Sequence, residues 1–267
     1  MRKLFVLCTF CFLLLPSPLF ASIEIDPMRM ELQADSGKPI AGYISITNRG
    51  NENIDISLSP GEYRYMFSVE TIYPKNSEPQ TLPSCKNWIN LKPDKVKLEK
   101  GKTQQIQYSI NVPSSAKNEY VAAILIDEEQ PAAPIEPGTA GQVRIKITPR
   151  INIPVYVEIK DSLKMSCEIT NLEAVSSKNK KFVWFSAAVK NSGTVHIRPT
   201  VTLTIIDQYK TVVKKIPLGK TLPIFAGFAE RLTAEWVPDF TGKYTVVATA
   251  DIGTENFAQK SAEFDVK

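Results

Sequence analysis

Apolar and polar residues alternate with a period of two along most of the chain after residue 21. The alternating runs are rich in Val, Ile, Thr and Tyr, and turn residues such as Pro, Gly and Asn separate them. No segment shows the 3.6-residue period of an amphipathic helix. Because alternation of this kind places one face of a strand on a core and the other toward water, the sequence predicts an all-β protein.

The alternating runs form two sets of about seven, the number that an immunoglobulin-like β-sandwich requires. The runs of the first set cover residues 22–33, 39–48, 52–58, 86–98, 103–112, 118–126 and 142–159. Those of the second set cover residues 164–175, 181–190, 198–207, 211–217, 229–236, 242–251 and 256–266. The sequence therefore predicts two immunoglobulin-like β-sandwich domains in tandem, at 22–160 and 163–267, whose short junction at Asp161 and Ser162 restricts the angle between them.

The last run of the first set is the longest alternation in the chain. Its odd positions are all apolar: Val143, Ile145, Ile147, Pro149, Ile151, Ile153, Val155, Val157 and Ile159. At about 3.3 Å per residue the run reaches roughly 55 Å, whereas typical strands have about five or six residues. Its two prolines, Pro149 and Pro154, favour an edge position. The run is either a strand offered to another polypeptide, or an ordinary last strand that bends at Pro149 and continues into the linker.

The first residues have the features of a secretory signal peptide. Arg2 and Lys3 supply a basic start, Leu4–Leu15 form an apolar stretch, and cleavage is expected after Ala21. Residues 1–21 are therefore predicted to direct export. After residue 21 no apolar run approaches the roughly 18 residues of a membrane-spanning helix, so no membrane span is expected once the signal is removed.

Charge and cysteine content narrow the possible partners. The chain has 32 basic and 28 acidic residues, a balance that argues against nucleic acid as a partner because nucleic-acid binding needs a concentrated basic face. Outside the signal peptide the chain has two cysteines, Cys85 and Cys167, which fall in different predicted domains. A disulfide between the domains, two buried thiols and one reactive thiol are all compatible with the sequence.

Catalytic and metal-binding motifs are not found in the sequence. The one histidine, His196, lies in a predicted turn with no Cys, Asp or Glu at metal-ligand spacing, which favours a structural or exposed side chain. No glycine-rich phosphate loop, nucleophile elbow or paired histidine motif occurs. The acidic run Asp127–Glu129 is expected to open a solvated loop at 131–141. We therefore expect a protein that is not an enzyme and uses no cofactor or metal.

Several segments of the first half occur in an order and spacing typical of one protein family. They are the opening Ile23–Leu32, then Gly42–Asn48, Trp88–Pro93, the pair Leu98 and Gly101 before Gln104–Ile106, and the long final run. Together they make residues 23–159 resemble the PapD-type periplasmic chaperones, which assemble pilus subunits. The resemblance implies a periplasmic protein whose partners are pilus or surface-fibre subunits.

The resemblance also implies a binding site. In that family the final strand of the first domain lends alternate apolar residues to an incomplete subunit, and an arginine and a lysine anchor the C-terminal carboxylate of the subunit. Arg29 matches the arginine, whereas the lysine position falls on Asn152, so Arg150 on the same face is the alternative cation. The implied client-binding residues are Arg29, Val143, Ile145, Ile147, Arg150 and Asn152.

The second half resembles a different module. Lys190–Pro199, Trp236 and Gly242–Val246 are similar to segments of the immunoglobulin-like modules of bacterial surface-binding and adhesion proteins. This leaves an alternative function, in which the protein is a structural or adhesive surface component. Its long strand would then be only the spine between the two domains.

Overall fold

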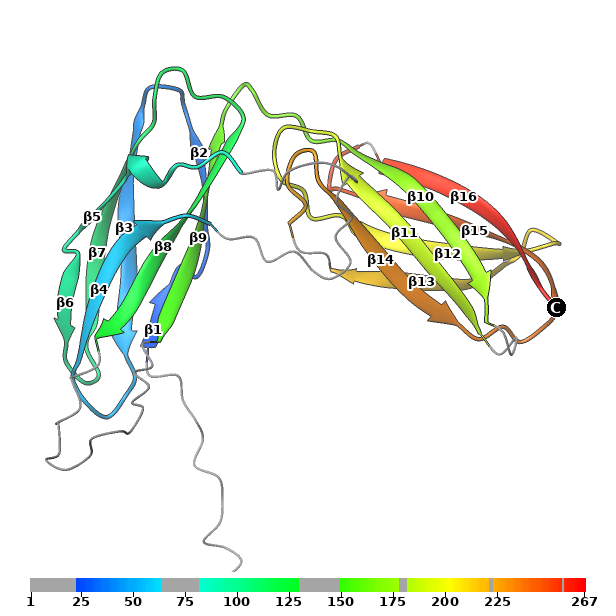
Figure 1. Ribbon diagram of the computed structural model, residues 1–267, viewed down its shortest axis with the longest axis horizontal. Helices are drawn as coiled ribbons and strands as arrows, with labels where there is room; N and C mark the ends of the chain where they lie inside the picture. The colour runs from blue at the N-terminus through cyan, green and yellow to red at the C-terminus, as the bar shows by residue number, and fades with distance from the viewer. Residues whose placement is uncertain (1–22, 64–81, 130–148, 178–181, 221–222, 256) are drawn as a thin grey trace, which may run out of the picture.

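The computed structural model describes residues 23–63, 82–129, 149–177, 182–220, 223–255 and 257–267. In these ranges the chain is built from β-strands and a single short 3-10 turn, which confirms the all-β prediction. Two sandwiches follow one another, as predicted, and meet at an angle (Figure 1). No helix among the described residues is long and apolar enough to cross a membrane.

The first sandwich consists of two facing sheets. One sheet has the strand order β1-β3-β7-β5 and the other the order β2-β9-β8-β4-β6. The strands are β1 (Ile23–Asp26), β2 (Met30–Ala34), β3 (Pro39–Asn48), β4 (Ile54–Gly61), β5 (Ile89–Lys92), β6 (Lys95–Leu98), β7 (Thr103–Asn111), β8 (Glu119–Glu129) and β9 (Arg150–Ile159). The 3-10 turn, η2 (Lys86–Trp88), precedes β5.

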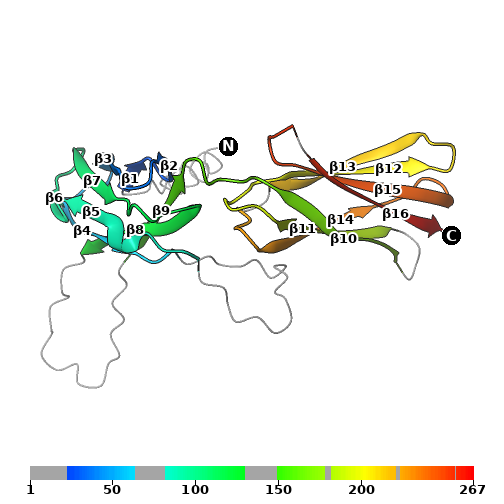
Figure 2. The ribbon, with the colours of Figure 1, turned by 90° about the horizontal axis from the view of Figure 1, so that it is seen from above.

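The second sandwich has a three-stranded sheet, β10-β11-β14, and a four-stranded sheet, β13-β12-β15-β16. Figure 2 shows the two sheets of this sandwich facing each other, with the first sandwich beyond its end. The strands are β10 (Cys167–Ser176), β11 (Val183–Asn191), β12 (Thr200–Asp207), β13 (Val212–Lys220), β14 (Ala229–Trp236), β15 (Gly242–Asp251) and β16 (Phe257–Val266).

Each sandwich encloses a separate apolar core, because alternate residues of its strands turn inward. Fully buried side chains of the first core include Ile44, Ile46, Ile106, Ile124 and Ile153. Those of the second core include Phe185, Val201, Leu203, Ile205 and Val246. Both cores are therefore built mainly from branched aliphatic residues, the type that packs well on a pleated sheet.

Two predicted strands are wrong as single elements. Residues 22–33 form β1 and β2, which belong to different sheets, and residues 86–98 likewise form β5 and β6. Each break lies at a proline, Pro27 or Pro93, and both prolines follow a cis peptide bond. Because proline has no N–H to give to a sheet, the chain can leave one sheet there and enter the other.

The acidic run at the end of β8 also differs from expectation. Asp127–Glu129 were expected to open a solvated loop, but they belong to β8 and pair with β4. Their side chains are matched by basic neighbours, since Asp127 binds Arg150 and Glu129 lies 3.7 Å from Lys95. The predicted signal peptide, the loop at 131–141 and the proposed donor residues Val143, Ile145 and Ile147 lie outside the described residues.

Candidate functional site

Strand β9 is paired on one side along its length and on the other side only in its second half. It runs antiparallel to β8 from Arg150 to Glu158. It runs parallel to β2 only from Val155 to Ile159. Along Arg150–Pro154 no described strand pairs with the side of β9 opposite β8, so this stretch is an open edge of the sheet.

The hydrogen-bond register shows which backbone groups face this open edge. Pro149 O accepts from the N–H of Glu128 at 3.3 Å, and the N–H of Ile159 donates to Asn118 O at 2.8 Å. Odd-numbered residues of β9 therefore bond to β8, and even-numbered residues direct their backbone groups to the other side. Arg150 and Asn152 present both N–H and C=O to the open edge. Pro154 presents only a carbonyl, so its missing N–H costs no bond to β8.

The side chains of β9 divide between two faces. Its apolar row, Ile153, Val155, Val157 and Ile159, is buried in the core of its own sandwich, and Ile151 packs against that core. The even positions, Arg150, Asn152, Pro154, Tyr156 and Glu158, lie on the outer face. The described part of the apolar row is therefore used internally, and only the residues before Pro149 remain as possible donors of apolar side chains.

Arg29 lies at the end of the open edge. It directly precedes β2, whose first residue Met30 is paired with Val155, so Arg29 is level with Pro154. Asn152 and Arg150 lie about 7 and 13 Å further back along the same face. The structure thus places Arg29, Asn152 and Arg150 on one side of the sheet but spreads them along the edge.

Arg150 and Asn152 have different surroundings. Arg150 forms a two-bond ion pair with Asp127, with Nε–Oδ1 and Nη2–Oδ2 distances of 2.6 and 2.9 Å. This hydrogen bond and the charge of Asp127 raise the pKa of the Arg150 guanidinium. Asn152 faces a hollow of about 470 Å³ on the outer face of the sheet, whose lining includes Tyr63, Lys86 and Leu125. Arg150 therefore already has an acidic partner, and Asn152 does not supply a charge.

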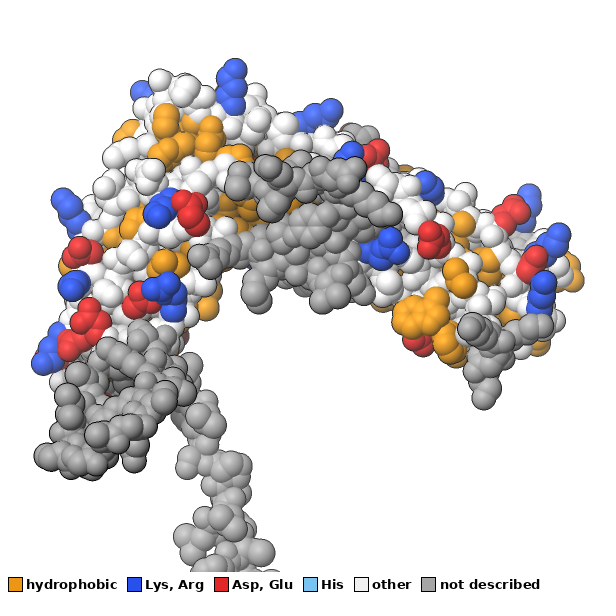
Figure 3. Space-filling view, in the orientation of Figure 1, with side chains coloured by type: hydrophobic (Ala, Val, Ile, Leu, Met, Phe, Trp, Pro, Cys, Tyr) orange, Lys and Arg blue, Asp and Glu red, His pale blue; other side chains and the backbone are white. Residues whose placement is uncertain are grey.

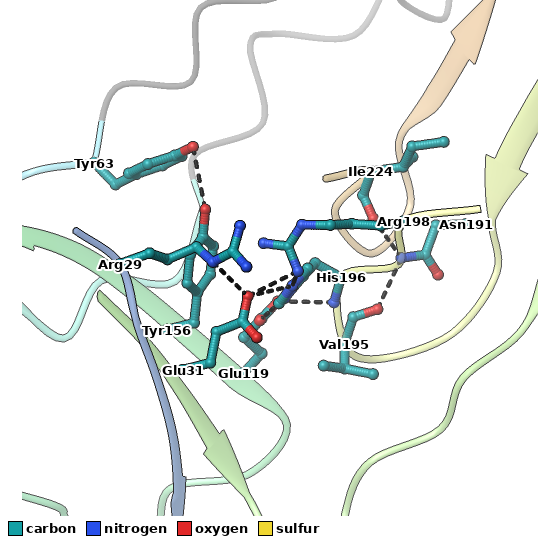
Figure 4. A network of polar contacts seen from close by, with 10 residues as sticks. All are labelled: Arg29, Glu31, Tyr63, Glu119, Tyr156, Asn191, Val195, His196, Arg198 and Ile224. Carbon is teal, nitrogen blue, oxygen red and sulfur yellow. Dashed lines mark hydrogen bonds and ion pairs between the residues drawn. The ribbon is translucent and has the colours of Figure 1, made fainter. Parts of the chain in front are cut away.

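A chain of polar contacts joins the two sandwiches beside Arg29 (Figure 4). Glu31 of β2 is the first link: its Oε1 lies 3.0 Å from Nε of Arg29 and 2.8 Å from Nη1 of Arg198. Arg198 comes from the loop before β12, so this carboxylate connects the first sandwich to the second. Arg198 Nη1 also lies 2.6 Å from Nε2 of His196.

The next link is a buried carboxylate. Glu119, at the start of β8, accepts the backbone N–H of His196 at 2.9 Å and a second hydrogen bond from the Nδ1 atom of the ring. Because the Arg198 guanidinium can only donate, Nε2 of His196 must accept, and these partners assign the ring proton to Nδ1. His196 is a buried structural side chain, one of the two alternatives that the sequence favoured, and its acidic partner Glu119 lies 77 positions away in sequence.

The arrangement around His196 does not fit a metal ion well. Ligand atoms of His196, Glu119 and Glu158 lie within 4.8 Å of one another. Both ring nitrogens of His196 are already hydrogen-bonded, however, and the positive Arg198 lies next to the ring. Burial raises the pKa of the Glu158 carboxyl, and the nearby charges of Glu119 and Glu31 raise it further. The cluster is therefore a hydrogen-bond network between the sandwiches.

Aromatic rings close the junction next to this network. Tyr156 of β9 is buried, stacks on Phe225 of the second sandwich with ring centroids 6.1 Å apart, and lies 4.6 Å from the His196 ring. The Tyr63 ring packs against the rings of Tyr156 and Phe225, with centroid distances of 5.9 and 5.8 Å. Burial raises the pKa of the Tyr156 hydroxyl, which is hydrogen-bonded to Tyr63 at 3.4 Å. These contacts give the junction a small apolar core.

The linker between the sandwiches is held by the turn after β11. The N–H of Thr194 donates to Lys164 O at 2.8 Å, and its hydroxyl accepts from the N–H of Lys164 at 2.8 Å. The N–H of Ser192 donates to Ser166 O at 3.0 Å. At Gly193 a Cβ atom would lie 2.1 Å from Lys164 O, so only glycine allows this close approach. The linker is therefore bound to the second sandwich.

Cys85 and Cys167, the two cysteines among the described residues, are free thiols, so the disulfide that the sequence left open between the domains is not formed. Cys85 is buried in the first core, and burial raises the pKa of its thiol to about 12. Cys167 is partly buried at the start of β10, and burial raises its pKa as well. Neither thiol therefore has the lowered pKa of a reactive cysteine.

No protein-family model and no curated protein matches the sequence. Among solved structures, the chain is similar to the chaperone CfaA of class 5 fimbriae, with 13% identity over 90% of this chain and 98% of that chain and a TM-score of 0.45. Many of the solved structures to which it is similar are fimbrial chaperones.

Two further similar structures are complexes. One is a chaperone–tip adhesin complex of CFA/I fimbriae biogenesis, with 14% identity over 91% of this chain and 98% of that chain and a TM-score of 0.46. The other is the Salmonella enterica SafA pilin in complex with the SafB chaperone, with 14% identity over 93% and 98% and a TM-score of 0.43. These are similarities of fold, and they extend beyond the residues 23–159 that resemble PapD-type chaperones in sequence.

Surface charge on the face shown in Figure 3 is mixed, with basic and acidic side chains interspersed over both sandwiches. At the end of the open edge lie Arg29 and Arg198, both paired with Glu31. Arg29 was predicted from the sequence, whereas Arg198 and Glu31 were not. Their pairing depends on how the two sandwiches meet, which no local spacing encodes.

Proposed function

We propose that this protein is a non-catalytic periplasmic chaperone that binds pilus or surface-fibre subunits by adding one of their strands to the open edge of β9. The observation that carries the proposal is the unpaired stretch Arg150–Pro154, whose outward backbone groups end at Arg29. Addition of a strand to such an edge is a common mode of peptide recognition, because it satisfies backbone groups that are otherwise bonded only to water.

The charge of Arg29 selects the direction of the added strand. A strand added along Arg150–Pro154 would lie on the same side of β9 as β2, which pairs with Val155–Ile159. Arg29, directly before β2, lies where the added strand would end. If the added strand runs parallel to β9, its C-terminus reaches Arg29 and a carboxylate faces a guanidinium. If it runs antiparallel, a terminal ammonium faces the same guanidinium and is repelled. The parallel direction with a free C-terminus is therefore favoured.

The upstream residues Val143, Ile145 and Ile147 are the proposed apolar donors. In the sequence they continue the odd-numbered row whose later members fill the core of the first sandwich. An incomplete subunit that lacks one strand would gain their side chains as part of its own core. Replacing Ile145 and Ile147 by Asp should abolish subunit capture and leave the thermal transition unchanged, whereas undiminished capture would contradict the donor role.

The open edge is tested by removing one outward N–H. Asn152→Pro deletes a donor that faces the edge but none that faces β8, and Pro154 shows that an even position of β9 accepts proline. Asn152→Ala is the matched control, because it removes the same side chain and keeps the N–H. The probe is a fluorescein-labelled peptide with two lysines followed by four Thr-Val repeats and a free C-terminus, measured by fluorescence anisotropy.

We expect Asn152→Pro to weaken peptide binding about tenfold relative to Asn152→Ala, the effect of one lost hydrogen bond and of the added ring at the edge. Both variants should keep the thermal midpoint of the unmodified protein within a few degrees. Equal affinities for the two variants would show that the edge of β9 is not the binding surface. The structural or adhesive alternative would then be preferred.

A further inference from the structure

Two guanidinium groups from different sandwiches converge on one carboxylate oxygen at the end of the open edge. Arg29 and Arg198 lie 3.0 and 2.8 Å from Oε1 of Glu31. All three side chains are open to solvent, with exposed fractions of 54%, 30% and 38%. The Glu119–His196 pair behind them is about 95% buried, so the two parts of the network differ in access.

We propose that Arg29 and Arg198 together form the binding site for the terminal carboxylate of the added strand, and that Glu31 occupies this site in the free protein. The proposal rests on the strand addition proposed above. It assigns a binding role to a residue of the second sandwich and a competing role to a carboxylate of the first.

The charges around the open edge favour Arg198 as the second cation. Arg150 lies about 13 Å from the level of Arg29 and is bound by both oxygens of Asp127. Asn152 is neutral. Among the described carboxylates, Arg29 and Arg198 form an ion pair only with Glu31. Two positive groups therefore share one solvent-exposed carboxylate, while the buried Glu119 carboxylate behind them is engaged by His196.

Arg198 is also held in position before any ligand arrives. Its Nη1 donates to His196 Nε2, and its guanidinium carbon lies 5.6 Å from the centroid of the Tyr156 ring. A side chain fixed in this way loses little conformational entropy when it binds a carboxylate. An incoming carboxylate meets the pair where Glu31 Oε1 lies, so it must displace Glu31 or share the two arginines with it.

The experiment compares two forms of the Thr-Val peptide, one with a free C-terminal carboxylate and one with a C-terminal amide. Arg198→Gln should weaken binding of the free acid roughly tenfold and leave binding of the amide unchanged. Arg198→Lys keeps the charge and should restore part of the loss. Glu31→Gln removes the competitor and should strengthen binding of the free acid severalfold. Arg231→Gln and Glu168→Gln are controls and should change neither affinity, because Arg231 bonds to Ser186 and Glu168 pairs with Lys190, outside the network.

The outcomes separate this inference from the proposed function. If neither peptide binds the unmodified protein, strand addition fails and the carboxylate site fails with it. If both peptides bind and Arg198→Gln changes neither affinity, or lowers both equally, strand addition stands and the assignment of Arg198 as an anchor is overturned. A Glu31→Gln variant that binds the free acid more weakly than the unmodified protein would overturn the competing role of Glu31.

Discussion

Glu119→Gln is the sharpest test of the junction because it replaces one carboxylate oxygen by an NH2 group and leaves the shape of the side chain almost unaltered. In the structure the two carboxylate oxygens of Glu119 accept the backbone N–H of His196 and its Nδ1–H. A glutamine offers one oxygen and one NH2 group. If the oxygen takes the backbone N–H, the NH2 group faces the Nδ1–H, and if the amide is reversed it faces the backbone N–H.

Moving the ring proton does not relieve this conflict. With the proton on Nε2, His196 would accept from the glutamine NH2, but its Nε2–H would then point at Nη1 of Arg198, which is also a donor. One pair of facing donors remains in every arrangement. Since Glu119 and His196 are about 95% buried, the loss of one hydrogen bond to a charged acceptor should cost about 2–3 kcal/mol.

The assay is thermal unfolding followed by calorimetry at pH 7. A loss of this size should lower the midpoint by roughly 5–10 °C in a chain of this length. Glu168→Gln is the matched control, because Glu168 forms an exposed ion pair with Lys190 at 3.3 Å, and such pairs contribute about 0–1 kcal/mol. If Glu119→Gln lowered the midpoint no more than Glu168→Gln does, the network at the junction would not stabilise the protein as argued.

Three other predictions concern the linker, a raised carboxyl pKa and the thiols. Gly193→Ala places a methyl group against Lys164 O, so the linker must shift. We expect the free energy of unfolding to fall by about 1–3 kcal/mol and the radius of gyration in small-angle X-ray scattering to change. An unchanged radius would contradict the role of the turn after β11 in holding the linker. Because the pKa of Glu158 is raised on folding, its carboxyl favours the folded state when protonated and this contribution is lost as the pH rises through the raised pKa. Glu158→Gln should therefore stabilise the protein against urea at pH 7 and have no effect near pH 4. An equal gain in stability at the two pH values would contradict the raised pKa of Glu158. In the folded protein at pH 8 a thiol reagent should modify Cys167 before Cys85, whose thiol is buried with a pKa of about 12, and the reverse order would contradict this burial.

Much of the fold follows from the sequence because alternation with a period of two is a direct consequence of a two-sided sheet. In the second half the predicted strands 229–236 and 242–251 agree with β14 and β15 to the residue. The errors occurred where alternation continues through a proline, as at Pro27 and Pro93. The pattern shows which residues face a core but not which of two facing sheets carries them, so one predicted strand became two.

The candidate site could be predicted only in part. Arg29 was found through its place in a recognisable opening strand, but Glu119 and Arg198 were not, because their partners come from the other sandwich. Such contacts depend on the angle at which the sandwiches meet. That angle is fixed by the hydrogen bonds between the linker and the turn after β11 and by the aromatic contacts of Tyr156. Neither leaves a periodic signal in the sequence.

Because these contacts depend on the angle between the sandwiches, the second sandwich also takes part in the proposed binding. An exposed arginine beside an exposed glutamate, such as Arg29 with Glu31, contributes only about 0–1 kcal/mol. A second cation held at the right distance strengthens the discrimination between a carboxylate and an amide, and Arg198 is held there by His196. His196 is fixed in turn by Glu119, which belongs to the first sandwich. A carboxylate site of this kind therefore exists only while the two sandwiches keep this angle, so changes at Glu119 should weaken carboxylate recognition although Glu119 itself is buried away from the ligand.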